Sequence, residues 1–421
     1  MKETMFKPAN VQYTKVQSLH NNLCERCLSD SSRHRTDFYG RSYCLDCEPY
    51  GLSTNLTSLY RYHRMTVRKD HILSIPFSLS SVQKEGSSFF LHCLEQKKSG
   101  YLNAVCGAGK TEMMYDTILY ALNQNYRVCI TIPRRQVVEE LSKRIQSVFP
   151  RTTVRELHQD AKEDEGADII ISTTQQLIRY YQEFDLLIID EFDAFPLKGN
   201  PFLYRLIQKS LKPDGVLLIM SATVTSDTFR VVKQFEMQTY DIYERFHGED
   251  MDIPKIHLER NLYGKILHNE LPIIVKKTLD QWLQEEKYVF VFVPTIKRGE
   301  LLLSVFQEYG YQAKLFTSKT IFKSYELKDF EKRKTEVIIS TSILERGVTY
   351  PNLYVMIFWA DHSIFSKEMM IQIAGRVGRK ADFPHGEIIM FSEKITKAME
   401  EAINHIKKMN REKNKRDLCI L

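Results

Sequence analysis

The sequence predicts two α/β domains in tandem, each built on a parallel β-sheet, behind a small module that carries paired cysteines. The length of 421 residues accommodates two to three domains of ordinary size. From about residue 71 onward, short β-branched runs alternate with longer amphipathic stretches, which is typical of strands and helices in parallel sheets. Residues 1–70 are instead polar and hold no long periodic segment, so this part needs another source of stability.

The composition is that of a globular chain. It has 59 Lys and Arg residues against 53 Asp and Glu residues, a net charge of +6, and 43% hydrophobic residues, which excludes a fibrous or largely disordered protein. The basic excess permits a nucleic-acid partner but equally suits an ordinary enzyme. The longest apolar runs, 216–220 and 288–293, fall far short of the roughly 18 residues that a membrane span needs, and the first residues lack the apolar core of a secretory signal. We therefore expect no transmembrane segment and a cytoplasmic location.

The paired cysteines predict a metal site in the N-terminal module. Two residues separate the members of each pair, and sixteen residues separate the pairs, a spacing that suits four thiolates around one tetrahedral Zn²⁺. Four cysteine ligands close the coordination shell, so the zinc is expected to be structural. His34 is the other nearby candidate ligand, and we interpret it as a loop residue. The expected zinc ligands are Cys24, Cys27, Cys44 and Cys47.

The first α/β domain is expected at 71–245. Its strands alternate with segments of helical character, as a doubly wound sheet requires. The expected strands are 102–105, 127–132, 169–172, 186–190 and 216–220.

The second α/β domain is expected at 246–406. The polar, charge-mixed stretch from about 224 to 268, with Gly248 and Pro254, is interpreted as the connection between the domains. Residues 407–421 form a basic tail, which we interpret as a solvated helix end, with a nucleic-acid or partner contact as the alternative. The expected strands are 288–293, 337–340, 353–358 and 386–391, with a helix near 300–307.

The segment AVCGAGKTE indicates a phosphate-binding turn between the strand at 102–105 and the next helix. Glycines let the backbone wrap closely around phosphates, and the helix that follows presents free N–H groups. Lys110 would reach the β and γ phosphates of a nucleotide, and Thr111 would ligate Mg²⁺. The pattern ordinarily begins with Gly, whereas here Ala104 takes that position. The expected nucleotide-binding residues are Gly107, Ala108, Gly109, Lys110 and Thr111.

The segment LLIIDEFDAF supplies the acidic half of such a site. Its apolar run predicts a buried strand that ends at Asp190 and Glu191. Asp190 would hold Mg²⁺, and Glu191 would orient or deprotonate the attacking water. Solvated strand-end carboxylates are the alternative for this segment taken alone.

The segment QIAGRVGRK in the second domain suggests arginine fingers. Gln372, Arg376 and Arg379 lie at i, i+4 and i+7, which predicts one face of a helix. Two arginines beside glycines suit insertion against a phosphate. The alternative is that they form surface salt bridges. Together with Lys110, Asp190 and Glu191, these three complete the expected catalytic set.

These motifs resemble those of superfamily 2 helicases and translocases, whose two RecA-like domains clamp ATP between them. The resemblance covers roughly residues 75–395. It implies that Gln83 reads adenine, that Gly347 contacts the nucleotide, and that Ser221 and Thr223 relay the nucleotide state. The residues that it implies along the nucleic-acid track are Arg134, Arg135, Thr173, Thr174, Gln175, Thr295, Thr341 and Ser342.

Two departures from the common pattern favour DNA over RNA as the track. Asp193, the last residue of the acidic box, is followed by Ala-Phe-Pro, and the fifth motif reads Glu-Arg-Gly-Val-Thr at 345–349 in place of the Ala-Arg-Gly-x-Asp common in RNA helicases.

The four-cysteine module in front of this motor, the DAFP string and the RFHGE string together resemble the ComFA family of late-competence ATPases. The resemblance implies an ATP-dependent single-stranded DNA translocase that uses ATP, Mg²⁺ and Zn²⁺. It also implies that the protein works with other competence proteins and the DNA-uptake channel at the inner face of the cell membrane. The alternatives are a replication-restart helicase similar to PriA, a generic superfamily 2 DNA helicase, and a nucleic-acid-binding scaffold with an inactive motor. The string YRYHR at 60–64 suits either base stacking or a partly packed helix.

Overall fold

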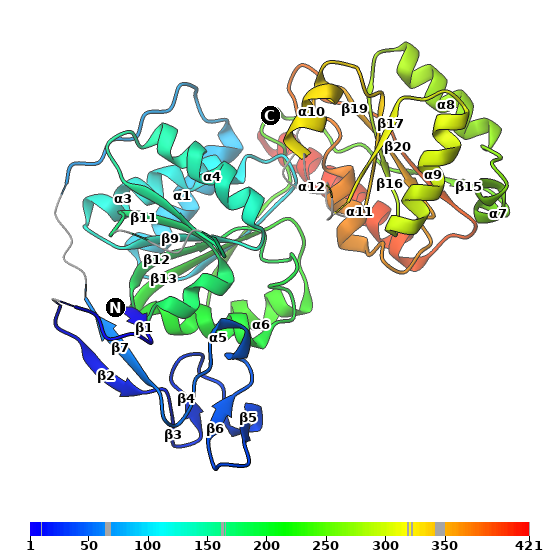
Figure 1. Ribbon diagram of the computed structural model, residues 1–421. Coiled ribbons are helices and arrows are strands. Elements are labelled where there is room, and N and C mark those ends of the chain that lie inside the picture. The colour runs from blue at the N-terminus through cyan, green and yellow to red at the C-terminus, as the bar shows by residue number, and fades with distance from the viewer. Residues whose placement is uncertain are drawn as a thin grey trace. The chain divides into compact units, whose positions relative to one another are not determined.

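The structure is a computed structural model that describes residues 1–9, 11–63, 69–160, 164, 166–317, 320, 323–341 and 350–420. Its contacts divide the chain into two compact units. The first unit comprises Met1–Ala104 and Lys110–Ile242, and the second comprises Val105–Gly109 and Tyr243–Leu421 (Figure 1).

The first unit is built on a seven-stranded sheet in the order β10-β11-β9-β12-β13-β8-β14, in which every pairing is parallel. The central strands β9 and β12 are buried along their whole length because both faces of the sheet are covered. The doubly wound fold predicted for this part is confirmed. The strands are β8 (Gly100–Ala104), β9 (Val128–Ile132), β10 (Val154–Leu157), β11 (Ile169–Thr173), β12 (Phe184–Ile189), β13 (Leu211–Ser221) and β14 (Gln238–Ile242).

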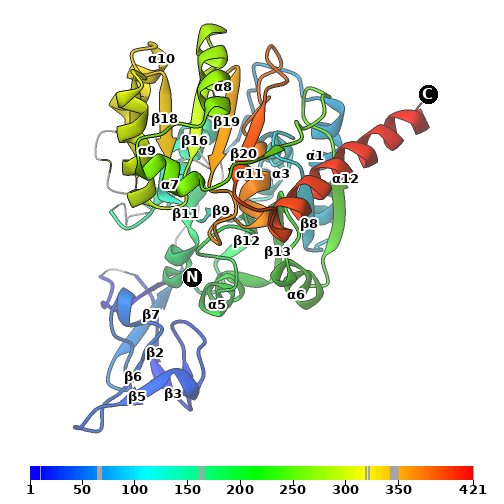
Figure 2. The ribbon, with the colours of Figure 1, turned by 90° about the vertical axis from the view of Figure 1, so that its right-hand side faces the viewer.

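Helices cover both faces of this sheet. Figure 1 shows α1, α3 and α4 on one face and α5 and α6 on the other. Figure 2 shows the same sheet turned by 90°. The two faces follow from right-handed crossovers, because the chain moves across the sheet from β8 to the edge strand β10 and then back to β14. The helices are α1 (Ser81–Glu95), α2 (Lys110–Met113), α3 (Tyr115–Asn123), α4 (Arg135–Val148), the 3₁₀ segment η3 (Thr174–Arg179), α5 (Pro201–Ser210) and α6 (Ser226–Gln234).

The second unit carries a six-stranded parallel sheet in the order β15-β20-β19-β16-β18-β17. Its strands are β15 (Lys255–Leu258), β16 (Tyr288–Phe292), β17 (Ala313–Phe316), β18 (Val337–Ser340), β19 (Leu353–Phe358) and β20 (Ile388–Ser392). Its helices are α7 (Leu262–Leu267), α8 (Ile273–Gln284), α9 (Ile296–Glu308), α10 (Lys323–Glu331), α11 (Lys367–Ala374) and α12 (Lys397–Ile420). None of the helices described in either unit is both long and apolar enough to cross a membrane.

The N-terminal module consists of short antiparallel elements. β7 (Ser58–Tyr62) pairs with β1 (Lys2–Thr4) and β2 (Thr14–Gln17) in a three-stranded sheet. Two hairpins carry the cysteine pairs, one formed by β3 (Leu19–His20) and β4 (Leu23–Cys24) and the other by β5 (His34–Thr36) and β6 (Ser42–Cys44).

Two interpretations of the sequence are wrong. Most of the stretch 224–268 is not a connection, because α6 and β14 complete the first unit while β15 and α7 begin the second. Residues 60–62 belong to strand β7 rather than to a helix, and Arg61 is only 5% exposed. Arg61 donates hydrogen bonds to Glu3 and Glu25 and lies 3.6 Å from the centre of the Tyr181 ring, so it is a packing residue and not a site for bases.

Candidate nucleotide site and zinc centre

The turn after β8 has the backbone that phosphate binding requires. Gly107 and Gly109 adopt φ values of +87° and +79°, a region that side chains other than glycine rarely occupy. Thr111 lies in the first turn of α2, and the Lys110 ammonium donates a hydrogen bond of 3.0 Å to the carbonyl oxygen of Ala104. The lysine therefore lies folded against the base of the turn, from which it can reach a phosphate.

Three predicted motifs meet at one edge of the first sheet. Strands β8, β13 and β12 are neighbours and run parallel, so the phosphate turn, the Ser221–Thr223 segment and the acidic box follow three adjacent strand ends. Ligands of open parallel sheets bind outside the carboxyl ends of the strands. Asp190 directly follows β12, and the side chains fit Mg²⁺ with a nucleotide, because Thr111 and Asp190 offer the oxygen ligands that this ion prefers.

The acidic box has a fixed backbone. Glu191 adopts a φ of +57°, its N–H donates to the Asp190 carboxylate at 2.8 Å, and the Asp190 N–H donates to the carbonyl of Thr131 at 3.0 Å. A left-handed φ is uncommon for glutamate and costs free energy, so the surrounding hydrogen bonds must hold it in place.

A buried hydrogen bond joins the acidic box, residues 190–193, to the Ser221–Thr223 segment. The Thr223 hydroxyl donates to the Asp193 carboxylate at 2.6 Å, and Asp193 is 5% exposed. The Ser221 hydroxyl donates to the Thr223 carbonyl at 2.6 Å, which holds the segment in place. A displacement of the box therefore changes a contact of Thr223.

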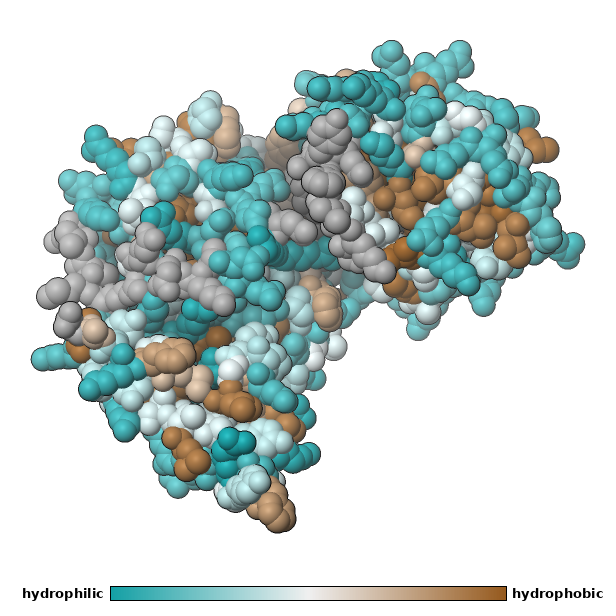
Figure 3. Space-filling model, in the orientation of Figure 1, coloured by the Kyte–Doolittle hydropathy of each residue, from teal (hydrophilic) through white to brown (hydrophobic). Residues whose placement is uncertain are grey.

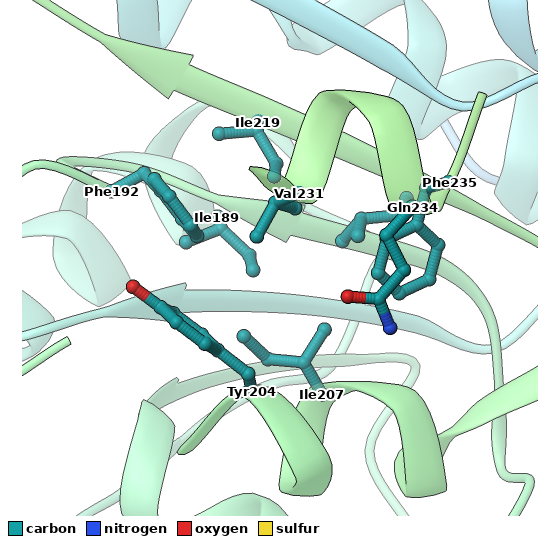
Figure 4. A pocket seen from close by; sticks show the side chains of 9 residues that line it. Ile189, Phe192, Tyr204, Ile207, Ile219, Val231, Gln234 and Phe235 are labelled. Atoms are coloured by element: carbon teal, nitrogen blue, oxygen red, sulfur yellow. The ribbon is translucent and has the colours of Figure 1, made fainter. Parts of the chain in front are cut away.

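Phe192 anchors the box in an apolar pocket between the sheet and helices α5 and α6 (Figure 4). Its ring stacks on Tyr204 of α5 with 5.7 Å between centroids and 17° between planes. The pocket is lined by Ile189, Phe192, Tyr204, Ile207, Leu217, Ile219, Val231, Gln234 and Phe235. Helix α5, which follows the acidic box in the chain, thus packs against Phe192 of the box.

The predicted helical face of Gln372, Arg376 and Arg379 is wrong in part. Gln372 lies on α11, but this helix ends at Ala374, and both arginines follow in a turn. Arg376 is only 2% exposed, and the Arg379 side chain donates to the Gly375 carbonyl at 2.9 Å. Gly375 is the C-cap of the helix, and Gly378, further along, has a φ of +67°, in the left-handed region that favours glycine.

Arg245 is a residue that the sequence reasoning missed. It is 1% exposed, its guanidinium donates to the Gly378 carbonyl at 2.8 Å, and His247 donates to the same oxygen at 2.9 Å. Burial lowers the pKa of Arg245 to about 10, which leaves it charged at neutral pH. Within the second unit, the Phe246 N–H also donates to the carbonyl of Gly107 at 3.0 Å. The RFHGE string, taken as part of a connection, thus contacts both the phosphate turn and the turn between Arg376 and Arg379.

The residues expected along a nucleic-acid track in the first unit differ in accessibility. Arg134 and Arg135 lie at the start of α4, and Arg135 pairs with Glu139 at 2.9 Å and with Asp160. Thr173 and Thr174 are 9% and 1% exposed, so their side chains offer little surface to a ligand. Gln175, on η3, is partly exposed.

The remaining predicted residues have these positions. Gln83 lies in the first turn of α1, where its carbonyl oxygen accepts from the Ser80 N–H at 2.9 Å in a capping box. Thr295 caps α9, because its hydroxyl accepts from the Arg298 N–H at 3.2 Å. Thr341 directly follows β18, and the two other predicted positions, Ser342 and Gly347, lie outside the described residues.

The four predicted zinc ligands converge. All four cysteines are 0% exposed, and their sulfur atoms lie within 4.8 Å of one another. The Sγ atoms of Cys24 and Cys47 are 3.7 Å apart, and those of Cys27 and Cys44 are 3.6 Å apart. With Zn–S bonds of about 2.3 Å, a tetrahedral site requires sulfur separations of about 3.8 Å. The cluster therefore fits Zn²⁺ and is too open for disulfides.

The module is fixed to the first unit through helix α5. The Lys209 ammonium, with 0% of its side chain exposed, donates to the Glu3 carboxylate at 2.7 Å and to the carbonyls of Arg26 and Ile178 at 2.8 and 3.0 Å. Arg205 donates to the Cys27 carbonyl at 3.1 Å. All three ammonium hydrogens of the buried lysine thus have acceptors.

The chain is similar to known helicases and competence proteins. Two family descriptions match the chain: "Type III restriction enzyme, res subunit" over residues 76–226 and "Helicase conserved C-terminal domain" over residues 272–381. Competence protein ComFA of Streptococcus pneumoniae is 32% identical over 93% of this chain and 90% of its own length. ComFA of Bacillus subtilis is 31% identical over 92% of this chain and 85% of its own length. The ATP-dependent DNA helicase RecG of Streptococcus pneumoniae is 26% identical over 73% of this chain, which spans about half of RecG.

Solved structures resemble the fold at low sequence identity. Saccharomyces cerevisiae Dbp5 bound to RNA and ADP BeF3 gives a TM-score of 0.60 at 19% identity, over 79% of this chain and 88% of its own. The DEAD-box helicase Mss116 bound to ssRNA and UDP-BeF gives 0.58 at 14% identity, over 78% of this chain and 77% of its own. These likenesses confirm two RecA-like domains.

Proposed function

The chain belongs to the ComFA family of competence proteins, and from this premise we propose that it is an ATP-driven translocase that moves single-stranded DNA during natural transformation. The matches to the two family descriptions and to the ComFA relatives show that the chain is an ATP-hydrolysing helicase or translocase. The observation that carries the proposal is the meeting of the phosphate turn, the Ser221–Thr223 segment and the acidic box at one sheet edge. This arrangement supports coupling between a nucleotide and a nucleic-acid track.

The residues of the chain have distinct roles in this proposal. The phosphate turn and Lys110 hold the β and γ phosphates, Thr111 and Asp190 hold Mg²⁺, and Glu191 orients the attacking water. When bound, Mg²⁺ neutralises charge on the phosphates.

Thr223 in the first unit and three residues of the second unit have further roles in the proposal. Thr223 carries a change at the box to the track through its hydrogen bond to Asp193. Arg376 and Arg379 supply positive charge, and Gln372 supplies a hydrogen-bonding amide, from the second unit when ATP is bound. Closure and opening of the two units then drive movement on the DNA.

The proposed partners follow from the family. We place the chain at the inner face of the cell membrane with other competence proteins and the DNA-uptake channel. The likeness to ComFA over most of the chain supports this placement.

ATP hydrolysis with and without single-stranded DNA tests the proposal. The wild-type rate is expected to rise when DNA is added. Lys110→Ala is expected to lower it by about 10² or more, because an essential phosphate contact is lost. Lys84→Ala, an exposed lysine on α1, is the matched control and should behave as wild type. Hydrolysis that does not respond to DNA would overturn the translocase proposal.

A further inference from the structure

The hairpin between β5 and β6 ends in two exposed aromatic residues. Phe38 is 97% exposed and Tyr39 is 90% exposed. Their rings contact edge to face, with centroids 5.6 Å apart and planes at 86°. Figure 3 shows apolar residues exposed at the lower end of the first unit, where Figure 1 places β5 and β6. Adjacent large aromatic side chains in full contact with water mark a binding surface more often than chance.

The turn that carries these rings is held rigidly. One oxygen of the Asp37 carboxylate accepts from the Tyr39 and Arg41 N–H groups at 3.0 and 2.9 Å. The Gly40 N–H donates to the Asp37 carbonyl at 3.1 Å, and Gly40 has a φ of +76°. This is a type I turn closed by a left-handed glycine, with Phe38 and Tyr39 at its two corner positions. The turn itself therefore directs both rings into solvent.

The base of the hairpin is fixed as well. β6 ends at Cys44, one of the four clustered thiols, so zinc would clamp the hairpin at its root. The module in turn contacts α5 and the chain that follows η3, where the Met1 ammonium donates to the Tyr181 carbonyl at 2.8 Å. η3 begins at Thr174, in a segment proposed to contact nucleic acid, and its last residues adjoin the module. The hairpin that carries the two rings is thus fixed to the rest of the first unit.

The surroundings of the rings are cationic. The ten residues 33–42 contain Arg33, Arg35 and Arg41 against one acidic residue, Asp37, and Arg33 also pairs with Asp46 at 2.8 Å. The Arg41–Asp37 ion pair of 2.9 Å is solvent-exposed on the arginine side, and such pairs are weak enough for phosphate to compete. Two side chains also offer far less than the roughly 800 Å² that each partner contributes to a stable protein interface. A small aromatic platform flanked by arginines instead matches a binding site for unpaired bases.

We propose that the Phe38–Tyr39 tip binds single-stranded DNA, with bases stacked on the two rings and phosphates contacted by Arg35 and Arg41. The proposal rests on the proposed function, because it takes DNA as the track. It adds a second contact for the strand, outside the predicted motifs of the two α/β domains. Stacking is sequence-tolerant, as a translocase requires.

The binding test compares the double variant Phe38→Ala, Tyr39→Ala with wild type by anisotropy of a labelled oligothymidylate. The affinity is expected to fall by about tenfold or more, while zinc content and DNA-free ATPase stay unchanged. Phe229→Ala removes a ring that is 68% exposed on α6 and serves as the matched control. An affinity within about twofold of wild type would overturn the proposal, including the case where the tip serves a protein partner.

A second variant keeps the ring and reports on it directly. Trp282 and Trp359 are each 2% exposed, so Phe38→Trp introduces the one solvent-exposed indole among the described residues. Oligothymidylate is expected to quench its emission, and unchanged emission at saturating DNA would overturn the proposal even if the double variant loses zinc. Failure of the proposed function has a different signature, because then the wild-type ATPase does not respond to single-stranded DNA.

Discussion

Thr223 tests coupling between the nucleotide site and the track at the scale of one atom. Thr223→Val removes the hydroxyl that donates to buried Asp193 and keeps the shape of the side chain. We expect DNA-free hydrolysis to persist and stimulation by single-stranded DNA to fall about tenfold or more, a loss equivalent to one strong hydrogen bond to a charged group. The ratio of rates with and without DNA measures this effect.

The matched control for Thr223 is Thr239→Val on the exposed side of β14, which should keep the wild-type ratio. If Thr223→Val also keeps the full ratio, the hydrogen bond to Asp193 has no part in coupling.

Lys209 tests how firmly the cysteine module is attached. Lys209→Met removes the donor to one oxygen of the Glu3 carboxylate and to two carbonyls, while Arg61 still donates to the other carboxylate oxygen. Removing one partner of a buried ion pair costs about 3–5 kcal/mol of unfolding free energy. The urea midpoint of the first unit is expected to drop accordingly.

Lys276→Met is the comparison for Lys209. This lysine pairs with Asp280 at 2.7 Å and is 50% exposed, so its loss should cost less than about 1 kcal/mol. Equal effects of the two substitutions would show that the contact at Lys209 contributes little to attachment.

The sequence predicts residues whose role depends on local spacing, and it misses those whose partners are distant. Lys110 and Asp190 could be found because glycines and a buried strand adjoin them in the chain. The bond from Lys209 to Glu3 spans 206 positions, so no pattern in either segment indicates it. The end of α11 before Arg376 could have been predicted, since Gly375 directly follows the last helical residue and glycine commonly ends a helix.

At the scale of elements, α5 links the acidic box to the zinc module. Tyr204 stacks on Phe192 of the box, while Arg205 and Lys209 on the other side of the helix contact carbonyls of the first cysteine pair. The helix that supports the acidic box is therefore in direct contact with the cysteine module. A strand-and-helix pattern predicts α5, but it does not reveal what the outer face of the helix meets.

Zinc removal is the prediction that belongs to this scale. Chelation, or Cys24→Ala, should release one zinc per chain and lower the melting temperature of the first unit by about 5 °C or more, because the module has no large apolar core of its own. Basal hydrolysis should persist, since the predicted nucleotide residues lie elsewhere. Thermal unfolding monitored by circular dichroism, together with metal analysis, measures both effects.

Restored melting after zinc is added back is the control for chelation. A chain that contains no zinc before treatment, or that loses zinc with no change in melting, would contradict the structural role of the four thiols.

At the scale of the whole molecule, the alternation of strand-like and helix-like segments in the sequence predicts both parallel sheets. The boundary between them was harder to locate, because the polar composition of 224–268 conceals α6, β14 and β15. Short elements with mixed charge lack the hydrophobic periodicity on which such prediction depends. The N-terminal sheet escaped prediction for a related reason, since β1, β2 and β7 are three to five residues long and largely polar.

The proposed translocase activity requires single-stranded DNA as the activator of ATP hydrolysis. The most direct measurement is the hydrolysis rate of the full chain at saturating ATP with oligonucleotides of equal length as single-stranded DNA, duplex DNA and RNA. We expect single-stranded DNA to give the largest stimulation and added salt to reduce it steeply, because the track is read mainly through phosphates. Equal rates with and without all three nucleic acids, or stimulation by RNA alone, would contradict this expectation.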